Sequence, residues 1–312
     1  MTDLHVVLGA GPAGSTIVDE LLRRGLRVRH VNLTPLADSP AETAVADVSD
    51  PEQATEATRG ATAIYHAVNV PYHQQVDAMP GIGAAVLRAA VANQARLVVL
   101  DTLYPYGEAD GAAITENTPW AATSRKGRMR ADLDRMYLAA HEDGSARVVL
   151  GRSADFYGPR VVNSTMGGAI FPAVLTGQRP LVFGDIDLPH SYSFIPDIAR
   201  GLVDLGTASD NGADGRVWHL PTVPAATTRE VLSMIGELTG TAVDPDIQDE
   251  PTPNAVFDAQ FMNEYAEMFY QHRIPQNMVS ADFERTFGSQ PTPLRDGLAV
   301  TLQWYREWLA QQ

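Results

Sequence analysis

An apolar strand that leads directly into a glycine-rich turn is the feature that most constrains this fold. Residues 4–18 read LHVVLGAGPAGSTIV, which places Gly9, Gly11 and Gly14 in the spacing Gly-x-Gly-x-x-Gly. In such a turn the first glycine permits a tight bend, the second lets the backbone approach a pyrophosphate, and the third lets the helix pack on the strand. The amide groups that open the helix then face an anion. With a strand before it and an amphipathic helix after it, the motif predicts a dinucleotide site.

Composition narrows the class of partner. The chain has 312 residues, enough for one large domain or two fused ones, and 38 acidic against 23 basic side chains give a net charge of −15. This charge would repel nucleic acid and anionic lipid, so we expect neither as a partner. The chain contains no cysteine, which excludes disulfides, thiolate metal sites and a cysteine nucleophile.

The first residues and the histidine spacing give two further expectations. Met1 to Asp3 lead straight into the first strand without a secretion signal, and no apolar run is long enough to cross a bilayer, which predicts a soluble cytoplasmic protein. Asp185 and Asp187 lie close to His190, but the other histidines show no ligand spacing, so we expect no metal.

Apolar runs alternate with helical patterns through the first half of the chain. This order predicts an α/β fold with a doubly wound parallel sheet over 1–157. A smaller substrate-binding region is expected over 158–312, discontinuous, with some segments returning to the sheet. The predicted strands are Val6–Leu8, Val28–Val31, Ala44–Val48, Ala63–Val68, Arg96–Leu100 and Arg147–Leu150.

Two helices are predicted in the second half. A capping box at Thr227–Glu230 precedes a helix over 231–239. A stripe of apolar residues marks another helix, for which core packing is favoured over ligand binding. The stripe comprises Phe257, Phe261, Tyr265, Met268 and Phe269.

The end of the second strand bears on the choice between NAD and NADP. An acid there binds the 2′-hydroxyl of NAD, and an arginine binds the 2′-phosphate of NADP. Asn32 stands in this stretch with neither signature, and Arg29 lies close in sequence, which gives a slight lean to NADP over NAD. Asp47 either accepts from the adenine amino group or caps a surface helix.

The order of these parts resembles the extended and atypical short-chain dehydrogenase/reductases, a superfamily that includes sugar-nucleotide epimerases and dehydratases. The matching stretches are GAGPAG, Asp47-Val48, YHAVNVPYH, LVVLDTLYPYG, GRSADFYGP, SFIPDIARGL and FGSQPTPLRDGL. The resemblance implies a Rossmann fold, an NAD(P) cofactor and a homodimer formed through two alanine-faced helices. The cofactor residues that it and the motif predict are Gly9, Gly11, Pro12, Ala13, Gly14, Asn32, Asp47, Val48, Ala67 and Arg128.

The chain departs from this superfamily at the catalytic pair. The resemblance implies that Thr102, four residues before Tyr106-Gly107, holds the substrate carbonyl, with a hydroxyl bonded to local backbone as the alternative. The expected Tyr-x-x-x-Lys pair is absent. Alignment on Asp132 puts Ser124 at the tyrosine position and Arg128 at the lysine position. A serine hydroxyl cannot replace the tyrosine as a proton donor, and Arg128 stays charged.

Several residues could supply the missing proton. Tyr104 is the first choice because it leaves the fifth strand at the carboxyl edge, where ligands bind in such sheets; Lys126 could provide a nearby cation. His190 is the second candidate acid. The remaining side chains predicted on the substrate side are Tyr106, Asp155, Tyr157 and Tyr192.

Three functions remain open from the sequence. The first is an NAD(P)-dependent oxidoreductase that reduces a carbonyl or activated C=C of a small organic substrate, with Thr102 and either Tyr104 or His190 as catalytic residues. An epimerase or dehydratase acting on a sugar nucleotide is the alternative if the cofactor is recycled within one turnover. A catalytically silent NAD(P)-binding sensor is the third.

Overall fold

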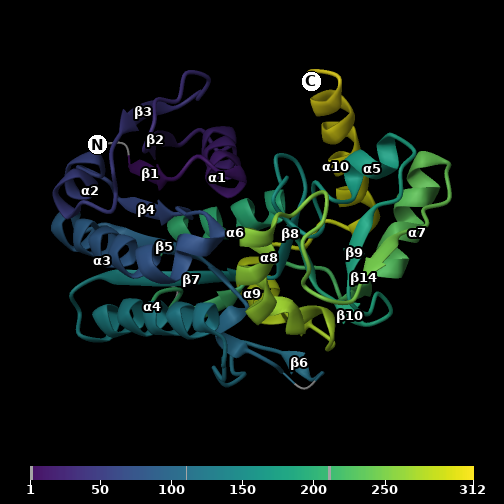
Figure 1. Cartoon of the computed structure of the whole chain (residues 1–312). Coiled ribbons are helices and arrows are strands. Elements are labelled where there is room, and N and C mark those ends of the chain that lie inside the picture. Colours follow the sequence, from purple (N-terminus) through teal and green to yellow (C-terminus); the bar gives the residue numbers. More distant parts are fainter. Residues whose placement is uncertain (1–2, 110, 210–211) are drawn as a thin grey trace.

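The computed structural model describes residues 3–109, 111–209 and 212–312, and its centre is one parallel sheet (Figure 1). All six predicted strands are present, and every pairing in the sheet is parallel. The predicted doubly wound α/β fold is therefore confirmed. The strand order is β12 (Val217–His219), β7 (Arg147–Ser153), β5 (Arg96–Thr102), β4 (Ala63–His66), β1 (Leu4–Leu8), β2 (Arg27–Asn32) and β3 (Glu42–Val45).

Helices cover both faces of this sheet because alternate strand residues point to opposite sides. Leu4, Val6 and Leu8 of β1 pack toward one face, and Val7 packs toward the other. The first face is covered by α2 (Pro51–Ala57), α3 (Gln75–Asn93) and α4 (Arg125–Glu142). The second is covered by α1 (Pro12–Arg23) and α6 (Ile195–Thr207).

The strand order reverses between β1 and β4, and this switch point determines where a ligand can enter. β1 runs to β2 and β3 on one side and to β4, β5 and β7 on the other. The helices that follow β1 and β4 therefore lie on opposite faces, which opens a crevice at the carboxyl ends of the two strands. The glycine-rich turn after β1 lies at this crevice.

The C-terminal half divides its residues between the sheet and a smaller unit. β12 and α6 belong to the sheet, and α9 (Ala281–Phe287) packs beside them through Phe283. The smaller unit has its own core, in which α10 (Leu294–Leu309) packs on α5 and α7. Its remaining elements are α5 (Phe171–Leu175), β9 (Leu181–Phe183), β10 (Pro189–His190), β13 (Ala226–Thr227), α7 (Thr228–Thr239) and β14 (Asp246–Gln248).

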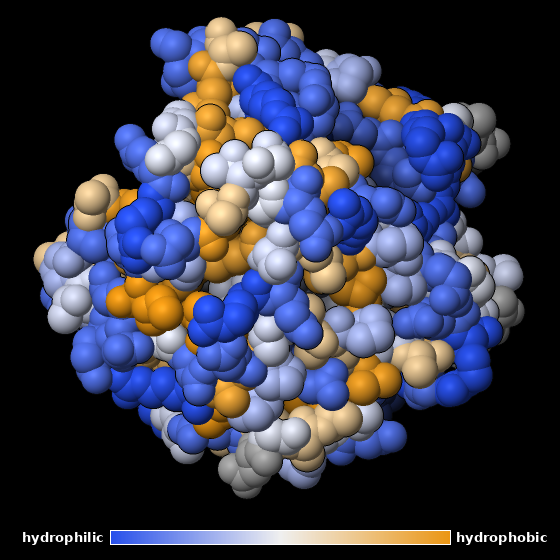
Figure 2. Space-filling view, turned by 90° about the vertical axis from the view of Figure 1, so that its right-hand side faces the viewer, coloured by the Kyte–Doolittle hydropathy of each residue, from blue (hydrophilic) through white to orange (hydrophobic). Residues whose placement is uncertain are grey.

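Local sequence explains how the elements of the smaller unit begin and end. The predicted capping box is present: Thr227 accepts from the Glu230 amide, and the Glu230 side chain accepts from the Thr227 amide. Gly240 ends α7 in the left-handed conformation, which glycine adopts without strain. The outer face of this unit is mainly hydrophilic, with apolar groups scattered across it (Figure 2).

In the part of the chain that the structure describes, four short strands, three 3-10 turns and one helix lie near the crevice, between the sheet and the smaller unit. β8 (Asp155–Tyr157) follows β7 and pairs with β11 (Tyr192–Phe194). β6 (Ala113–Ile114) pairs with β15 (Asn277–Met278). The 3-10 turns η1 (Tyr72–Gln74) and η2 (Tyr104–Tyr106) follow β4 and β5, and α8 (Ala259–Tyr265) with η3 (Ala266–His272) lies over η1.

Candidate active site

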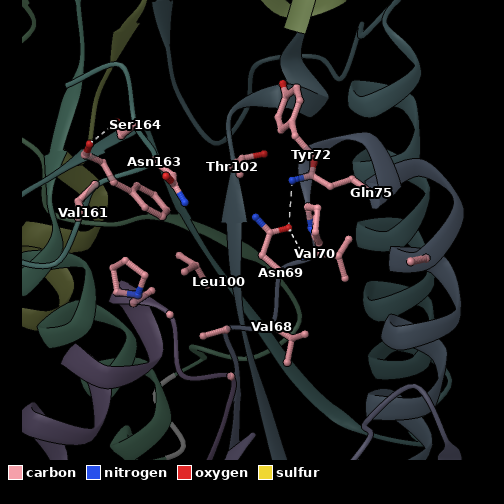
Figure 3. A pocket seen from close by; sticks show the side chains of 18 of the residues that line it. Val68, Asn69, Val70, Tyr72, Gln75, Leu100, Thr102, Val161, Asn163 and Ser164 are labelled. Carbon is pink, nitrogen blue, oxygen red and sulfur yellow. Dashed lines mark hydrogen bonds between the residues drawn. The ribbon is translucent and has the colours of Figure 1, made fainter. Parts of the chain in front are cut away.

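A cavity of about 1370 Å³ lies at the carboxyl ends of the central strands (Figure 3). One end is formed by residues 9–13, 31–33 and 46–49, which follow β1, β2 and β3. The other end is formed by 102–104, 153–156 and 161–165, together with residues of α8 and its preceding loop. The cavity therefore joins the glycine-rich turn to the predicted substrate side.

The glycine-rich turn has the close backbone packing that its motif requires. Gly9 has a φ of +99°, and a Cβ there would lie 2.9 Å from the Ala67 carbonyl oxygen. A Cβ on Gly14 would lie 1.9 Å from the Gly9 carbonyl oxygen, so helix and turn touch. A Cβ on Gly11 would meet no described atom within 4 Å. Only at Gly11 does the missing side chain leave open space, which fits a pyrophosphate.

The predicted adenosine end contains Asn32, Asp47 and Val48, all of which line the cavity. The Asn32 amide nitrogen donates to the Thr34 carbonyl oxygen at 3.2 Å and to its Oγ1 at 3.0 Å. Asp47 accepts from the Ser49 amide and hydroxyl, at 3.0 and 2.6 Å. Asp47 thus shapes a turn after β3 and presents a carboxylate beside the cavity.

Arg29 does not support the lean to NADP. Its guanidinium is 2.6 Å from Glu42 on β3 and donates to the Ala57 and Arg59 carbonyl oxygens at 3.1 Å. No lysine or arginine belongs to the described residues that line the adenosine end. A 2′-phosphate would have no cation to pair with among these residues, and the Asp47 carboxylate would repel it.

The α4 helix brings a different arginine to the cavity from the one predicted. Ser124 is the N-cap of α4 and accepts from the Gly127 amide at 3.1 Å. Arg128 donates to the Thr123 carbonyl oxygen at the exposed start of the helix and is not among the lining residues. Arg130 lines the cavity, is only 9% exposed, and its Nε has no hydrogen-bond partner among the described residues. Arg130, and not Arg128, is therefore the arginine of α4 that lines the cavity.

Lys126, one helical turn before Arg130, is fully buried between α4 and the α8–η3 segment. Its Nζ lies 2.5 Å from Glu264 and 3.0 Å from Glu267. It also lies 4.6 Å from the centre of the Tyr72 ring. Lys126 does not line the cavity itself, but it contacts Tyr72, which does.

Thr102 and Tyr104 both line the cavity. The Tyr104 amide donates to Thr102 Oγ1 at 3.4 Å, and the Tyr104 hydroxyl lies 3.5 Å from that of Tyr72. Burial, followed by the nearby Asp155 charge, raises the pKa of Tyr104 to about 12. Tyr104 is therefore a protonated phenol at neutral pH.

Asp155 and His190 form a pair in which only Asp155 lines the cavity. The His190 Nε2 lies 3.0 Å from Asp155 Oδ2, and its ring is 5.9 Å from that of His272. Burial pushes the pKa of Asp155 up, but the hydrogen bond and the electrostatic interaction with His190 outweigh it, so the pKa lies below its ordinary value. Asp155 thus presents an ionised carboxylate to the cavity.

Three predicted substrate-side tyrosines are instead packed outside the described cavity lining. The Tyr106 hydroxyl is 2.6 Å from His219 Nε2, and that of Tyr192 is 2.8 Å from Thr228 Oγ1. Tyr157 is 1% exposed, with its ring 5.2 Å from that of Phe194. Tyr157 and Tyr192 pack in the core beside the paired strands β8 and β11, and Tyr106 packs in a separate cluster after β5.

The apolar stripe near residue 260 contributes to a core cluster and to the cavity. Met268 and Phe269 are buried, as core packing requires. Tyr265 is buried in the same cluster, and Phe257 and Phe261 pack against it, so the stripe packs as predicted. Phe257, Phe261 and Tyr265 also line the cavity.

Several lining residues escaped the sequence prediction. Gln75 donates to Asn69 Oδ1 at 3.0 Å in Figure 3, and Arg130 enters from α4. Helical spacing was an available signal for Arg130, since it lies three and seven residues before the buried Leu133 and Tyr137. No such signal marked the others, which are Tyr72, Asn163, Ser164, Thr165, Gln271 and Gln276.

The described residues contain neither a cluster of metal ligands nor a helix that could span a membrane. No group of three or more acidic, histidine or cysteine side chains in the described ranges could hold a metal ion. Within the same ranges, no helix is both long and apolar enough to pass through a bilayer.

Known dehydratases and epimerases resemble this chain. The dTDP-glucose 4,6-dehydratase of Actinoplanes sp. is 25% identical over 213 residues, which are 68% of this chain and 60% of that protein. The chain thus spans about 60% of the length of this curated relative.

Solved structures share the whole fold. UDP-glucuronic acid 4-epimerase from Bacillus cereus, in complex with UDP-glucuronic acid and NAD, is 16% identical with a TM-score of 0.78, over 98% of this chain and 99% of that one. DesIV, a dTDP-glucose 4,6-dehydratase from Streptomyces venezuelae with NAD bound, is 22% identical with a TM-score of 0.77, over 99% and 98%.

The family follows from a profile that covers more than half of the chain. The profile described as the NAD dependent epimerase/dehydratase family matches residues 5–220, from β1 through β12. This chain belongs to the NAD dependent epimerase/dehydratase family.

Proposed function

We propose that the chain is an NAD-dependent enzyme that oxidises or reduces one alcohol or carbonyl carbon of its substrate. The observation that carries the proposal is the cavity, which runs without interruption from the glycine-rich turn to Thr102, Tyr104 and Asp155. When bound, the nicotinamide ring supplies the acceptor or donor of hydride. The chain holds the two reactants side by side, which accounts for much of the rate gain in such a reaction.

The lining residues fit a dinucleotide. The open space at Gly11 suits a pyrophosphate next to the helix start, and Arg130, which lines the cavity, offers a cation to an anionic group. The carboxylate of Asp47 and the absence of a cation from the described adenosine end favour NAD over NADP. We therefore propose NAD as the cofactor.

In this proposal, the substrate oxygen lies among Thr102, Tyr104 and Asp155. The Thr102 hydroxyl orients it by a hydrogen bond. In the direction of reduction, the protonated Tyr104 phenol gives its proton to the oxygen of the carbonyl. In the direction of oxidation the same step runs in reverse: the alcohol carbon loses hydride, its oxygen returns a proton to Tyr104, and the ionised Asp155 accepts the proton that Tyr104 gives up. Asp155 and Tyr104 together replace the missing tyrosine.

The comparisons support a reaction in which the cofactor is regenerated within each turnover. The named relatives are epimerases and dehydratases, and this favours such a reaction over net reduction of a carbonyl. We therefore place epimerisation or dehydration first, and net reduction second.

Incubation with NAD or NADH and a panel of candidate substrates distinguishes these reactions. The panel should hold UDP-glucose, dTDP-glucose and uncharged cyclic alcohols and ketones, with product and NADH followed together. Product formed with catalytic NAD and no net change in NADH supports the first reaction, and stoichiometric NADH consumption supports the second. NAD binding without turnover of any compound would overturn the proposal and favour a sensor.

A further inference from the structure

We infer that the substrate end of the cavity takes an uncharged cyclic alcohol or ketone that carries no phosphate, in place of a sugar nucleotide. The inference rests on the proposed function and names its substrate class. Two independent features of the described residues carry it: the charges that line the cavity and its aromatic wall.

Charge argues against a second pyrophosphate. The described lining residues include two cations, Arg130 and Arg160, and Arg160 is paired with Asp19 of α1 at 2.6 Å. A dinucleotide already brings two negative charges to the cavity, and Arg130 would pair with them. Asp155 and Asp258 add carboxylates at the substrate end. A nucleoside diphosphate sugar would bring two more negative charges to an end where Arg160, in an exposed pair with Asp19, is the remaining cation among the described lining residues.

The aromatic wall, defined as Tyr72, Tyr104, Phe257, Phe261 and Tyr265, lines the cavity with contiguous rings instead. The rings of Phe257 and Phe261 stack at 4.8 Å, and those of Phe261 and Tyr265 stack at 5.4 Å. Tyr72 continues this row at 5.2 Å from Phe261. Contiguous rings that face a cavity gain most from a ring-shaped apolar ligand, by stacking and by burial of its surface.

Binding to the NAD-saturated protein, measured by calorimetry, tests the inference without any need for turnover. The probes are 2-naphthol and 1-tetralone as aromatic compounds, methyl glucoside as an uncharged carbohydrate, and UDP and UDP-glucose as phosphates. We expect at least one uncharged probe to bind at least about tenfold more tightly than UDP-glucose, a difference of about 1.4 kcal/mol. The aromatic and carbohydrate probes then tell which kind of ring is preferred.

Two variants and one control variant test whether binding depends on the aromatic wall and on the charge of Asp155. Phe261→Ala should weaken binding of the preferred probe at least about tenfold. Trp308→Ala is the control, since it removes an aromatic ring on α10 outside the cavity lining, and it should leave this affinity unchanged. Asp155→Asn should raise the affinity for UDP-glucose several-fold by removing one negative charge. Circular dichroism and NAD binding confirm that each variant is folded.

Either of two outcomes would overturn the inference: UDP-glucose binding as tightly as every uncharged probe, or no uncharged probe binding while NAD still does. Failure of the proposed function is separate. It appears as absent NAD binding, or as absent turnover of a compound that binds.

Discussion

Asp155 faces the cavity and His190 lies behind it, with Nε2 of the histidine 3.0 Å from Oδ2 of the carboxylate. His190 therefore acts on a substrate only through Asp155. If Asp155 accepts the substrate proton, Asp155→Asn should lower kcat by about 10²- to 10⁴-fold. The measurement is steady-state turnover of the substrate found in the panel, with NAD binding as the control.

His190 has a separate signature as a positioning residue. Because its hydrogen bond and charge hold the pKa of Asp155 below the ordinary value, His190→Phe should raise that pKa. The acid limb of the kcat/KM profile should then move to higher pH, since Asp155 must be ionised to accept a proton. A profile that keeps its acid limb while activity falls would show a merely structural role.

Tyr104 and Tyr72 make a matched pair, since both line the cavity and their hydroxyls lie 3.5 Å apart. If Tyr104 supplies the proton in the direction of reduction, Tyr104→Phe should lower kcat by about 10²-fold or more with little change in KM. Tyr72→Phe should change kcat by less than about tenfold, because Tyr72 contributes its ring to the wall. Equal losses in the two variants would argue against Tyr104 as the donor.

Gly11 provides a clean test of the dinucleotide site. An added Cβ would meet no described atom within 4 Å, and the residue has a φ of −68°, which alanine adopts without strain. Gly11→Ala should leave the melting temperature of the free protein within about 2 °C. It should weaken NAD binding at least about tenfold in calorimetry, because the methyl group enters the pyrophosphate space. Unchanged affinity would place the cofactor elsewhere.

Lys126 joins α4 to the segment that carries the aromatic wall. Lys126→Met would leave Glu264 and Glu267, which are 25% and 18% exposed, without their buried partner. We expect a loss of about 2 kcal/mol in the free energy of unfolding, below the roughly 3–5 kcal/mol for fully buried pairs. Arg125→Met is the control, since the 56% exposed Arg125 pairs with the same two glutamates and should cost at most about 1 kcal/mol. Urea unfolding measures both.

Buried neutral histidines should make the fold sensitive to mild acid. Burial lowers the pKa of His66 and His272 to about 3 and that of His219 to about 4, against 6.5 in the unfolded chain. As pH falls below 6.5, the unfolded state therefore binds protons first. Stability should fall by up to about 4 kcal/mol per pH unit between roughly pH 6 and 4.

Urea unfolding at several pH values measures this slope, and one variant assigns part of it. His66→Leu should remove about one third of the slope, because His66 Nδ1 has no partner among the described residues to lose. A flat profile over this pH range would show that the histidines do not control acid stability.

Sequence alone could predict the sheet and the cofactor end because their signals are local. Strand periodicity and the positions of Gly9, Gly11 and Gly14 depend on neighbours within a few residues, and the structure has every predicted strand. The third strand ends at Val45, earlier than the predicted Val48, because Asp47 and Ser49 form a turn there. Element ends depend on such side-chain contacts.

The substrate side was harder to predict because its contacts are distant in sequence. Arg128 and Arg130 differ by two helical positions, and only the packing of α4 on the sheet decides which one faces inward. Phe261 and Phe269 belong to one aromatic cluster, yet only Phe261 lines the cavity. Tyr106 and Tyr157 follow sheet strands as Tyr104 does, but their partners in the core come from residues 190–220 and beyond.

The edge strand β12 has a consequence for synthesis on the ribosome. Its partner β7 ends at Ser153, yet Val217–His219 must emerge before the sheet gains its last strand, and α6 must emerge before the second face is fully covered. A nascent chain that stops at residue 157 would expose an unpaired strand and an uncovered apolar face, both of which promote aggregation. The dinucleotide-binding half should therefore resist isolation as a soluble fragment, and any useful truncation has to keep the polypeptide through His219.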